Sequence, residues 1–258
     1  NKLLIRKRLK TPVMMATCNN NPLAKESAYL VTCYEFIKGR PLYLVNFNLK
    51  LIRKMIKTLY SLNDLLSRLR SDMRFHNIID RENYTDKIEF LYDTSKACKD
   101  LKERELINKS LKQIHGHYAF NSNDYARKLI HCNISLSNML YDGKFVHVLD
   151  LSHVRLDYEL NDLANFYVSL LFFDTSEEKI DVLVTEYFKI FKISENKRKI
   201  LSNFILLNLV KEYLKVLQKE QNSLSHKVQP KGMELFRREL LIRKNKIHDK
   251  ISQMISPS

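Results

Sequence analysis

The spacing of apolar residues changes along the chain, and each change predicts a different kind of element. From position 49 onward, apolar side chains recur every three or four residues, which predicts one long amphipathic helix with a buried face. Asn48 stands where this helix would begin, and an asparagine side chain is well suited to cap a first turn. The apolar positions are Leu51, Ile52, Met55, Ile56, Leu59, Leu62, Leu65, Leu66 and Leu69.

The rest of the chain is mostly helical in pattern, with a short extended region in the middle. Helical spacing continues over 84–115 and returns over 162–173, 178–192, 195–220 and 233–250. Residues 129–156 break that period and contain short apolar runs typical of strands. Residues 28–34 are rich in aromatic and β-branched side chains and predict a buried strand ahead of Gly39. We therefore expect an α+β protein with a small β region set among helices.

Composition agrees with a folded chain that has a substantial core. Apolar residues make up 45% of the sequence, yet no apolar run approaches the roughly 18 residues that cross a bilayer, so we expect no membrane span. Cysteines 18, 33, 98 and 132 have no spacing typical of a zinc site or of a disulfide framework. This favours a reducing compartment and synthesis in the cytoplasm.

The net charge of +15 favours anionic partners, although it does not select among them. Nucleotides, nucleic acids and anionic surfaces all fit. The alternative is that the positive charges simply coat solvated helix faces, and the basic residues of 227–250 are interleaved with apolar ones as in an amphipathic helix. Since no recognised nucleic-acid module accompanies the charge, nucleic acid is the less favoured partner.

The residues that carry chemistry lie between positions 131 and 150. Asp142-Gly143, between two apolar β-prone runs, predicts a tight hairpin that folds 139–141 back against 145–149. Asn138 and Asp150 would then emerge at the same end of the ribbon. An amide oxygen and a carboxylate placed together are suitable ligands for Mg²⁺, which shares its shell with substrate phosphates. The sequence therefore predicts a metal and nucleotide site here.

The segments HCNISLSNML, VHVLDLSHVRLD and NDLANFY resemble the catalytic region of the aminoglycoside phosphotransferase and choline kinase superfamily. Within it, the run YEFIKGR at 34–40 is similar to the interlobe hinge of spore-coat proteins of the CotS type. The resemblance implies a protein-kinase-like fold: a helical C-terminal lobe, a small β-hairpin catalytic region and a truncated N-terminal β lobe. We expect residues 1–40 to be the remnant of that lobe with the hinge, and residues 41–258 to be the helical lobe.

The resemblance also implies roles for individual residues. Asn138 would hold a magnesium ion, and Asp150 would bridge the metal to the β- and γ-phosphates of ATP. His131 would brace the catalytic loop. Asp162 would tie that loop down from a helix start, where a carboxylate is also suitable as a cap.

In the hinge, the resemblance implies that backbone groups near Glu35 and Ile37 meet the edge of the adenine. The cofactors implied are thus ATP and Mg²⁺, and the substrate a small molecule with a hydroxyl group. If the site is not used, no cofactor is required.

Two departures from the family pattern bear on activity. Asn133 occupies the position of the general-base aspartate, and its amide neither accepts a proton at neutral pH nor carries negative charge. Too few residues precede Tyr34 for a complete nucleotide lobe, and none of Lys2, Lys7 and Lys10 lies in a strand context suited to a phosphate-binding lysine. Either the upstream lobe has been trimmed or is disordered, or the protein has lost it.

These observations favour a kinase-fold protein of the spore-coat type that is catalytically impaired and acts as a structural or interacting component, with spore-coat proteins as partners and the spore coat as its location. One alternative is an active phosphotransferase that uses ATP and Mg²⁺ to phosphorylate a hydroxyl group. The other is a basic module that binds nucleic acid or another anionic polymer. The sequence does not specify the oligomeric state.

Overall fold

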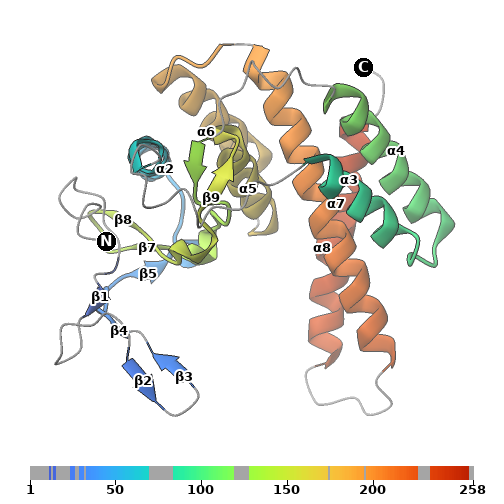
Figure 1. Cartoon of the computed structure of the whole chain (residues 1–258), viewed down its shortest axis with the longest axis horizontal. Coiled ribbons are helices and arrows are strands. Elements are labelled where there is room, and N and C mark those ends of the chain that lie inside the picture. The colour runs from blue at the N-terminus through green and yellow to red at the C-terminus, as the bar shows by residue number, and fades with distance from the viewer. Residues whose placement is uncertain are drawn as a thin grey trace. The chain divides into compact units, whose positions relative to one another are not determined.

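The computed structural model describes residues 12, 14–15, 24–26, 29–31, 33–69, 84–118, 128–173, 175–194, 196–225 and 233–255. The contacts between Cα atoms divide the chain into two compact units (Figure 1). Unit 1 comprises Asn1–Asp80, Arg127–Asp162 and Asp181–Lys192, and unit 2 comprises Arg81–Ala126, Leu163–Ile180 and Ile193–Ser258. The expected boundary at residue 40, between a lobe remnant and a helical lobe, stays a prediction. Lys2, Lys7 and Lys10 lie outside the described residues.

Short antiparallel strands make up the first part of unit 1. Strand β1 (Met14–Met15) pairs with β4 (Cys33–Tyr34), and β2 (Ala24–Glu26) pairs with β3 (Tyr29–Val31). The prediction of one buried strand over 28–34 is therefore wrong in two respects. The segment contributes strands to two separate sheets, and Tyr34 at its end is 50% exposed and not buried.

Helix α2 (Leu49–Leu69) forms the main apolar face of unit 1. Asn48 caps it, because its Oδ1 atom accepts a hydrogen bond from the backbone N–H of Leu51 at 2.9 Å. All of the predicted core positions from Leu51 to Leu66 are buried, and the helix contacts β6 and β8. At its far side Tyr60 stacks on Phe191 with ring centroids 3.8 Å apart, and Arg53 pairs with Glu186.

A small central sheet carries the segment of interest. Its strand order is β5-β7-β8, in which β5 (Arg40–Pro41) and β8 (Val146–Val148) flank β7 (Met139–Tyr141). Gly39 lies so close to β7 that a Cβ atom there would come within 3.3 Å of the Leu140 side chain and of the Tyr141 carbonyl oxygen. A side chain at this position would therefore have to push β7 away by a few tenths of an ångström, and glycine avoids this where the hinge run enters the sheet.

Short elements on either side complete unit 1. Strand β6 (Lys128–Ile130) pairs with β9 (Arg155–Asp157), and the 3₁₀ turns are η1 (Leu42–Leu44), η3 (Leu136–Asn138) and η4 (Leu151–His153). Helices α5 (Glu159–Phe172) and α6 (Glu177–Ile190) follow in the sequence.

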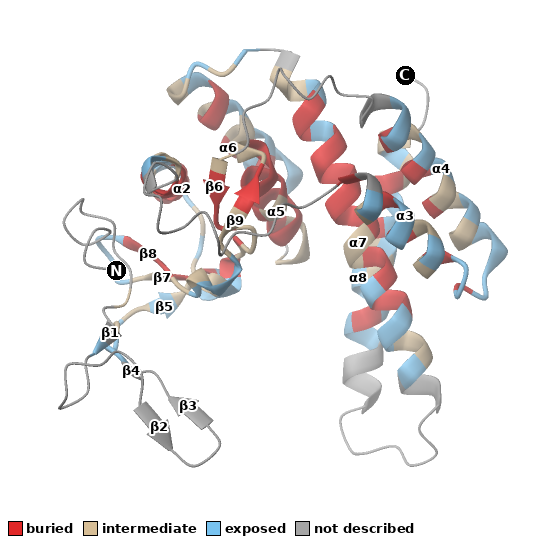
Figure 2. Ribbon diagram, in the orientation of Figure 1, coloured by how far each residue is buried: buried red, intermediate tan, exposed pale blue. Residues whose placement is uncertain are grey.

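Unit 2 contains a helical core. Helix α4 (Leu101–Tyr118) packs against α3 (Tyr84–Ser95), α7 (Asn196–Ser225) and α8 (Met233–Ile255). The buried positions run along α7 and along the facing sides of its neighbours (Figure 2). Tyr84 meets Phe204 edge to face, with ring centroids 5.5 Å apart.

Part of the basic character of the C-terminal helix serves this packing. The ammonium group of Lys244 lies 2.6 Å from a carboxylate oxygen of Glu103 and 3.0 Å from one of Glu220. Lys250 pairs with Glu177 at 3.2 Å. Two cations of the predicted amphipathic helix are thus neutralised within unit 2, which weakens the case for a helix devoted to an anionic polymer.

The predicted fold class is confirmed: the chain is a helix-rich α+β protein with small antiparallel sheets. The helices expected from periodicity are present within a few residues of their predicted bounds, except that the stretch 84–115 is divided into two helices, α3 and α4, by a break at residues 96–100. Among the helices of the described ranges, none combines the length and the apolarity of a membrane span.

The core face of α2 gives a first test. Leu62 is fully buried, so Leu62→Ala should lower the free energy of unfolding by about 2–5 kcal/mol through lost apolar burial and a residual cavity. Ser61→Ala, at the exposed neighbouring position, should change it by less than about 0.5 kcal/mol. Urea unfolding followed by circular dichroism compares the two, and equal effects would contradict the assignment of the buried face.

Candidate functional site

The ribbon of β7 and β8 brings Asn138 and Asp150 to the same end of the sheet. Met139 pairs with Val148 in the antiparallel register, and the backbone N–H of Leu149 donates to the carbonyl of Asn138 at 2.9 Å. Asp150 directly follows Leu149, so the strand pairing brings residues 138 and 150 to the same end of the ribbon, as predicted. The ribbon therefore brings Asn138 and Asp150 to the same strand end.

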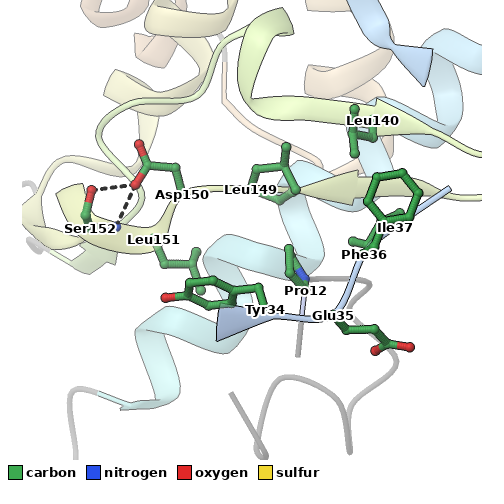
Figure 3. Close-up of a pocket in the computed structure, with 11 residues that line it drawn as sticks. Pro12, Tyr34, Glu35, Phe36, Ile37, Leu140, Leu149, Asp150, Leu151 and Ser152 are labelled. Carbon is green, nitrogen blue, oxygen red and sulfur yellow. Dashed lines mark hydrogen bonds between the residues drawn. The ribbon is translucent and has the colours of Figure 1, made fainter. Parts of the chain in front are cut away.

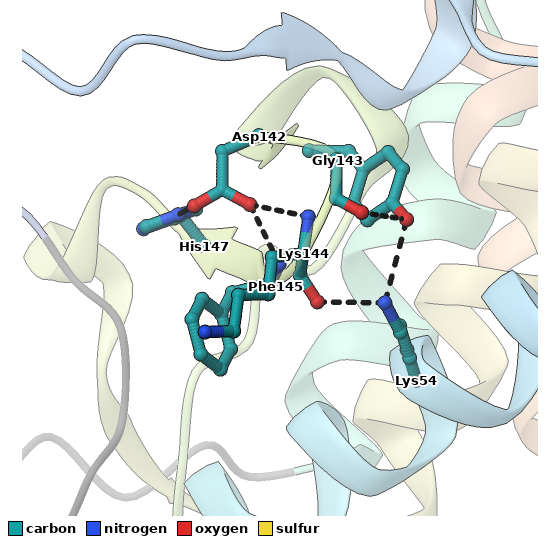
Figure 4. Close-up of polar contacts among 7 residues, drawn as sticks. Lys54, Asp142, Gly143, Lys144, Phe145 and His147 are labelled. Atoms are coloured by element: carbon teal, nitrogen blue, oxygen red, sulfur yellow. Dashed lines mark hydrogen bonds and ion pairs between the residues drawn. The ribbon is translucent and has the colours of Figure 1, made fainter.

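The other end of the ribbon is a turn whose tip is Gly143 and Lys144. Asp142 closes it: one carboxylate oxygen accepts hydrogen bonds from the N–H groups of Lys144 and Phe145, and the other lies 2.7 Å from Nε2 of His147 (Figure 4). Burial acts to raise the pKa of Asp142, but these hydrogen bonds outweigh it and lower the pKa to about 2. The carboxylate is thus ionised when it holds the turn.

Lys54 of α2 braces the same turn from outside the sheet. Its ammonium group donates to the carbonyl of Lys144 at 2.7 Å and lies 5.3 Å from the centre of the Tyr141 ring (Figure 4). The hydrogen bond and the cation–π contact of Lys54 connect the turn to the N-terminal half of α2. The ribbon is therefore fixed at its tip, which limits how far its other end, with Asn138 and Asp150, can shift.

His131 links the loop before the ribbon to the strand that leads into Asp150. Its Nδ1 atom accepts a hydrogen bond from the N–H of Asn133 at 3.3 Å, so Nε2 carries the proton and donates to the carbonyl of Leu149 at 3.0 Å. The residue is fully buried, and burial lowers its pKa. The imidazole is therefore a neutral brace with both nitrogens engaged.

Asp162 holds the same loop from helix α5. One oxygen of its carboxylate accepts from the N–H of His131 at 2.9 Å, and the other accepts from the N–H of Cys132 at 2.8 Å. Both oxygens of the Asp162 carboxylate are therefore hydrogen-bonded to the loop and do not cap its own helix, which begins at Glu159. Burial raises the pKa of Asp162 to about 7, against the lowering effect of the two amide hydrogen bonds.

Cys132 and Asn133 follow at the turn of this loop. Cys132 has a φ angle of 62°, a conformation that costs roughly 1–2 kcal/mol for a residue with a side chain, and the Asp162 hydrogen bond holds it there. Asn133, which is half-buried, accepts a hydrogen bond at its carbonyl from Nδ2 of Asn138 at 2.9 Å. The position of the expected base thus lies beside the expected metal ligand.

The same contact orients the side chain of Asn138. Because Nδ2 is engaged with the loop, the Oδ1 atom is the end of the amide that is left for a ligand. Asp150 supplies a carboxylate that is 42% exposed, and hydrogen bonds from Ser152 lower its pKa. One amide oxygen and one ionised carboxylate fit a Mg²⁺ ion that completes its shell with phosphate and water.

A cavity of about 780 Å³ opens beside this end of the ribbon, within the size range of small-molecule sites. All of its lining residues belong to unit 1: Pro12, Tyr34, Glu35, Phe36, Ile37, Leu140, Val148, Leu149, Asp150, Leu151 and Ser152. In Figure 3 the carboxylate of Glu35 turns away from the other labelled residues, so the cavity faces the backbone of the hinge run. This is an apolar slot with a carboxylate at one end.

The structure thus brings Glu35, Ile37 and Asp150 to one cavity, and joins His131, Asn133, Asn138 and Asp162 in one hydrogen-bonded loop beside it. Sequence reasoning missed the apolar walls, above all Leu140 and Leu151, because apolar residues of a strand and a turn carry no chemical signature. It also missed Ser152. The sequence did carry a signal for Ser152, because a serine two residues after an aspartate can donate a hydrogen bond to its carboxylate. The catalytic and metal-binding roles themselves stay predictions.

Comparison with known proteins identifies the fold. No protein-family model matches the chain, and no curated protein matches it either. Among solved structures, the amicoumacin kinase hAmiN in complex with AMP-PNP, Ca²⁺ and Ami has a TM-score of 0.69 at 12% identity, over 96% of this chain and 75% of that one. A microcompartment-associated aminopropanol kinase has a TM-score of 0.68 at 13% identity, over 97% and 78%.

The GDP complex of aminoglycoside 2′-phosphotransferase-IIIa is also similar, with a TM-score of 0.62 at 14% identity over 97% of this chain and 78% of that one. Identities this low show the fold alone. The chain therefore has the protein-kinase-like fold of the aminoglycoside phosphotransferases.

The buried carboxylate of Asp162 gives a pH-dependent prediction. Its pKa is raised from 3.8 to about 7, so its protonation stabilises the folded state fully below pH 4, and this contribution is lost as the pH rises through 7. Asp162→Asn cannot titrate and sets an NH₂ group against one loop N–H, which should cost about 1–3 kcal/mol. We expect the variant to have a lower free energy of unfolding than the parent at pH 5. The difference between the two free energies should become smaller towards pH 7.

Urea unfolding of both proteins across this pH range measures the gap. Asp181→Asn, at an exposed position of α6, is the matched control and should show neither the loss nor the narrowing. A gap that stays constant from pH 5 to pH 7 would contradict the raised pKa.

Proposed function

We propose that this protein binds a nucleotide with Mg²⁺ in a kinase-type site but is impaired in phosphoryl transfer, and that it acts as a structural or interacting component. The observation that carries the proposal is Asn133. It stands in place of the expected base inside a loop whose other parts, His131, Asn138 and Asp162, are joined by hydrogen bonds.

Nucleotide binding is supported by the cavity and by the groups at its rim. The hinge run presents backbone around Glu35 and Ile37 to an apolar slot, which suits the edge and faces of a base. Asn138 and Asp150 would hold Mg²⁺ against the phosphates. Two of the similar structures carry AMP-PNP with Ca²⁺ and GDP, respectively, which supports a nucleotide and a divalent cation as the ligands of this fold.

Impaired transfer follows from the chemistry of the loop. The amide of Asn133 cannot accept a proton from a substrate hydroxyl at neutral pH. His131 cannot replace it, because one nitrogen accepts from Asn133 and the other donates to Leu149. A general base typically contributes about 10²–10⁴-fold, so transfer would be slow while binding is retained.

The partner role rests on the resemblance of the hinge run and the catalytic segment to spore-coat proteins of the CotS type. Under this proposal the protein's partners are other coat proteins, and its place is the spore coat. Co-purification of the full chain with coat fractions of a spore former tests this part separately from nucleotide binding.

An active phosphotransferase acting on a small hydroxyl compound is the second candidate. The observation that favours it is the intact bracing of the loop and ribbon, because positioning and electrostatics supply most of the catalysis in phosphoryl transfer. Rapid ATP turnover by the unmodified chain with any such acceptor would replace the first proposal with this one.

Nucleotide binding is tested by thermal unfolding of the full chain with AMP-PNP and Mg²⁺. At about 100 times the dissociation constant, the ligand should stabilise the folded state by about 2.7 kcal/mol. Asp150→Ala should lose most of this effect, since it removes the carboxylate that would hold the metal. Asp181→Ala, at an exposed position of α6 that does not line the cavity, should retain it. Absence of any stabilisation in the unmodified protein would defeat the proposal.

Restoring a base tests the impairment. Asn133→Asp should raise the rate of ADP release from Mg²⁺-ATP by about 10²-fold or more, within the range for general-base catalysis. The gain should vanish in Asn133→Asp combined with Asp150→Ala. Asn245→Asp, which adds a carboxylate at an exposed position of α8, should leave the rate unchanged. If the unmodified protein already turns over as fast as Asn133→Asp, the site is not impaired.

A further inference from the structure

The backbone of Asp150 adopts an unusual conformation at the rim of the cavity. Its φ and ψ angles are 54° and 77°, in the left-handed region that residues with a side chain rarely occupy. Such a conformation is disfavoured for a residue with a Cβ atom, so neighbouring contacts must hold it. Strain of this kind is concentrated at binding and catalytic sites.

Ser152 supplies the holding contacts. Its hydroxyl group donates to Oδ1 of Asp150 at 2.5 Å, and its backbone N–H donates to the same oxygen at 3.2 Å (Figure 3). Both donors come from the turn η4, which Asp150 itself caps. One residue therefore fixes the orientation of the Asp150 carboxylate.

This arrangement leaves the two oxygens of Asp150 unequal. Oδ1 already accepts two hydrogen bonds, whereas the contact recorded for Oδ2 is a loose one, 3.9 Å from Nε2 of His153. Figure 3 shows the second oxygen directed away from Ser152. Asp150 can therefore offer its Oδ2 atom to a cation readily, but it can offer Oδ1 as well only if the hydrogen bond from the Ser152 hydroxyl breaks.

The number of oxygens offered matters for the choice of cation. Mg²⁺ demands six ligands in near-octahedral geometry and is bound through single carboxylate oxygens together with phosphates and water. Ca²⁺ takes six to eight oxygens and readily accepts both oxygens of one carboxylate. With Asn138 contributing one amide oxygen, a one-oxygen Asp150 matches the smaller ion.

We propose that Ser152 is a positioning residue that keeps Asp150 a one-oxygen ligand and thereby makes the nucleotide site select Mg²⁺ over Ca²⁺. The inference rests on the proposed function, because the cation is held together with the nucleotide phosphates. It extends that function from the presence of a divalent cation to the choice of one.

A purely structural role of Ser152 makes a different prediction. The residue is exposed at the cavity rim, so it contributes no apolar packing to unit 1. If its hydroxyl only stabilised the turn, its removal would weaken nucleotide binding equally with either cation. A change in the ratio of the two affinities requires that the hydroxyl acts on the ligand oxygens.

The experiment measures the dissociation constant of AMP-PNP for the full chain by calorimetry, once with saturating Mg²⁺ and once with saturating Ca²⁺. We expect tighter binding with Mg²⁺ in the unmodified protein. In Ser152→Ala the preference for Mg²⁺ should fall about tenfold, within the range found when a group that orients a metal ligand is removed. Affinity with Mg²⁺ should drop, and affinity with Ca²⁺ should stay level or rise.

Two further variants serve as controls. Ser152→Thr keeps the hydroxyl and should retain the preference to within about twofold. Ser202→Ala removes an exposed serine hydroxyl of α7 that donates to the carbonyl of Arg198, and it should change neither constant.

The outcomes separate this inference from the proposed function. If the unmodified chain binds AMP-PNP with neither cation, the proposed function fails. If it binds AMP-PNP but Ser152→Ala lowers both affinities in the same proportion, or changes neither, then Ser152 does not select the cation and the inference is overturned. Equal affinity of the unmodified protein for the nucleotide with the two cations would overturn it as well.

Discussion

The arrangement of the site depends on one buried carboxylate, that of Asp162. Its two oxygens bind consecutive N–H groups of the loop at His131 and Cys132, 31 and 30 residues earlier in the chain. A polar group this deeply buried is tolerated only when its hydrogen bonds are made, and unpaired loop amides would carry a comparable penalty. The carboxylate and the loop therefore stabilise each other. Asp162 also keeps Cys132 in its left-handed conformation, which sets the direction in which Asn133 leaves the turn. His131 then carries this order to Leu149, and so to Asp150.

The ribbon adds rigidity from a second side, and it does so with charges that the site itself does not use. Asp142, ionised because its pKa is lowered to about 2, closes the turn together with His147. Lys54 fastens the turn to α2. Lys54 and Asp142 do not line the cavity, yet both restrict movement of the strand pair that carries Asn138 and Asp150 at its opposite end. Positioning within fractions of an ångström is what phosphoryl transfer demands of a protein. These contacts order the ribbon and the loop, and under the proposed function that order does not depend on a base at position 133.

The sequence predicts the parts of this structure that depend on local pattern. The periodicity of Leu51 to Leu66 gives α2 and its buried face, and Asp142-Gly143 gives the hairpin, because helix and turn signals act over a few residues. The link from Asp162 to the loop was accessible only through the family resemblance, since nothing local in the sequence records a contact across 31 residues. Helix capping by Asp162 was a reasonable local expectation, but the carboxylate has a tertiary partner instead. The prediction of one strand over 28–34 was wrong for a related reason. The pairing of these segments in two ladders depends on which strands come together in the folded chain, not on their composition.

The separation between binding and transfer follows from which atoms each requires. Under the proposed function, binding of a nucleotide with a cation uses the apolar slot, the backbone of the hinge run, and the oxygens of Asn138 and Asp150. Acceptance of a proton needs a group that is basic at neutral pH at position 133, and the neutral amide there is not one. Among the described residues, the hydrogen bonds that link position 133 to Asn138 and His131 use its backbone: Asn138 donates to its carbonyl, and its N–H donates to His131. Any residue except proline presents the same two backbone groups at position 133. Under the proposed function, the loop therefore keeps its shape without a base, because the contacts at position 133 are made by its backbone.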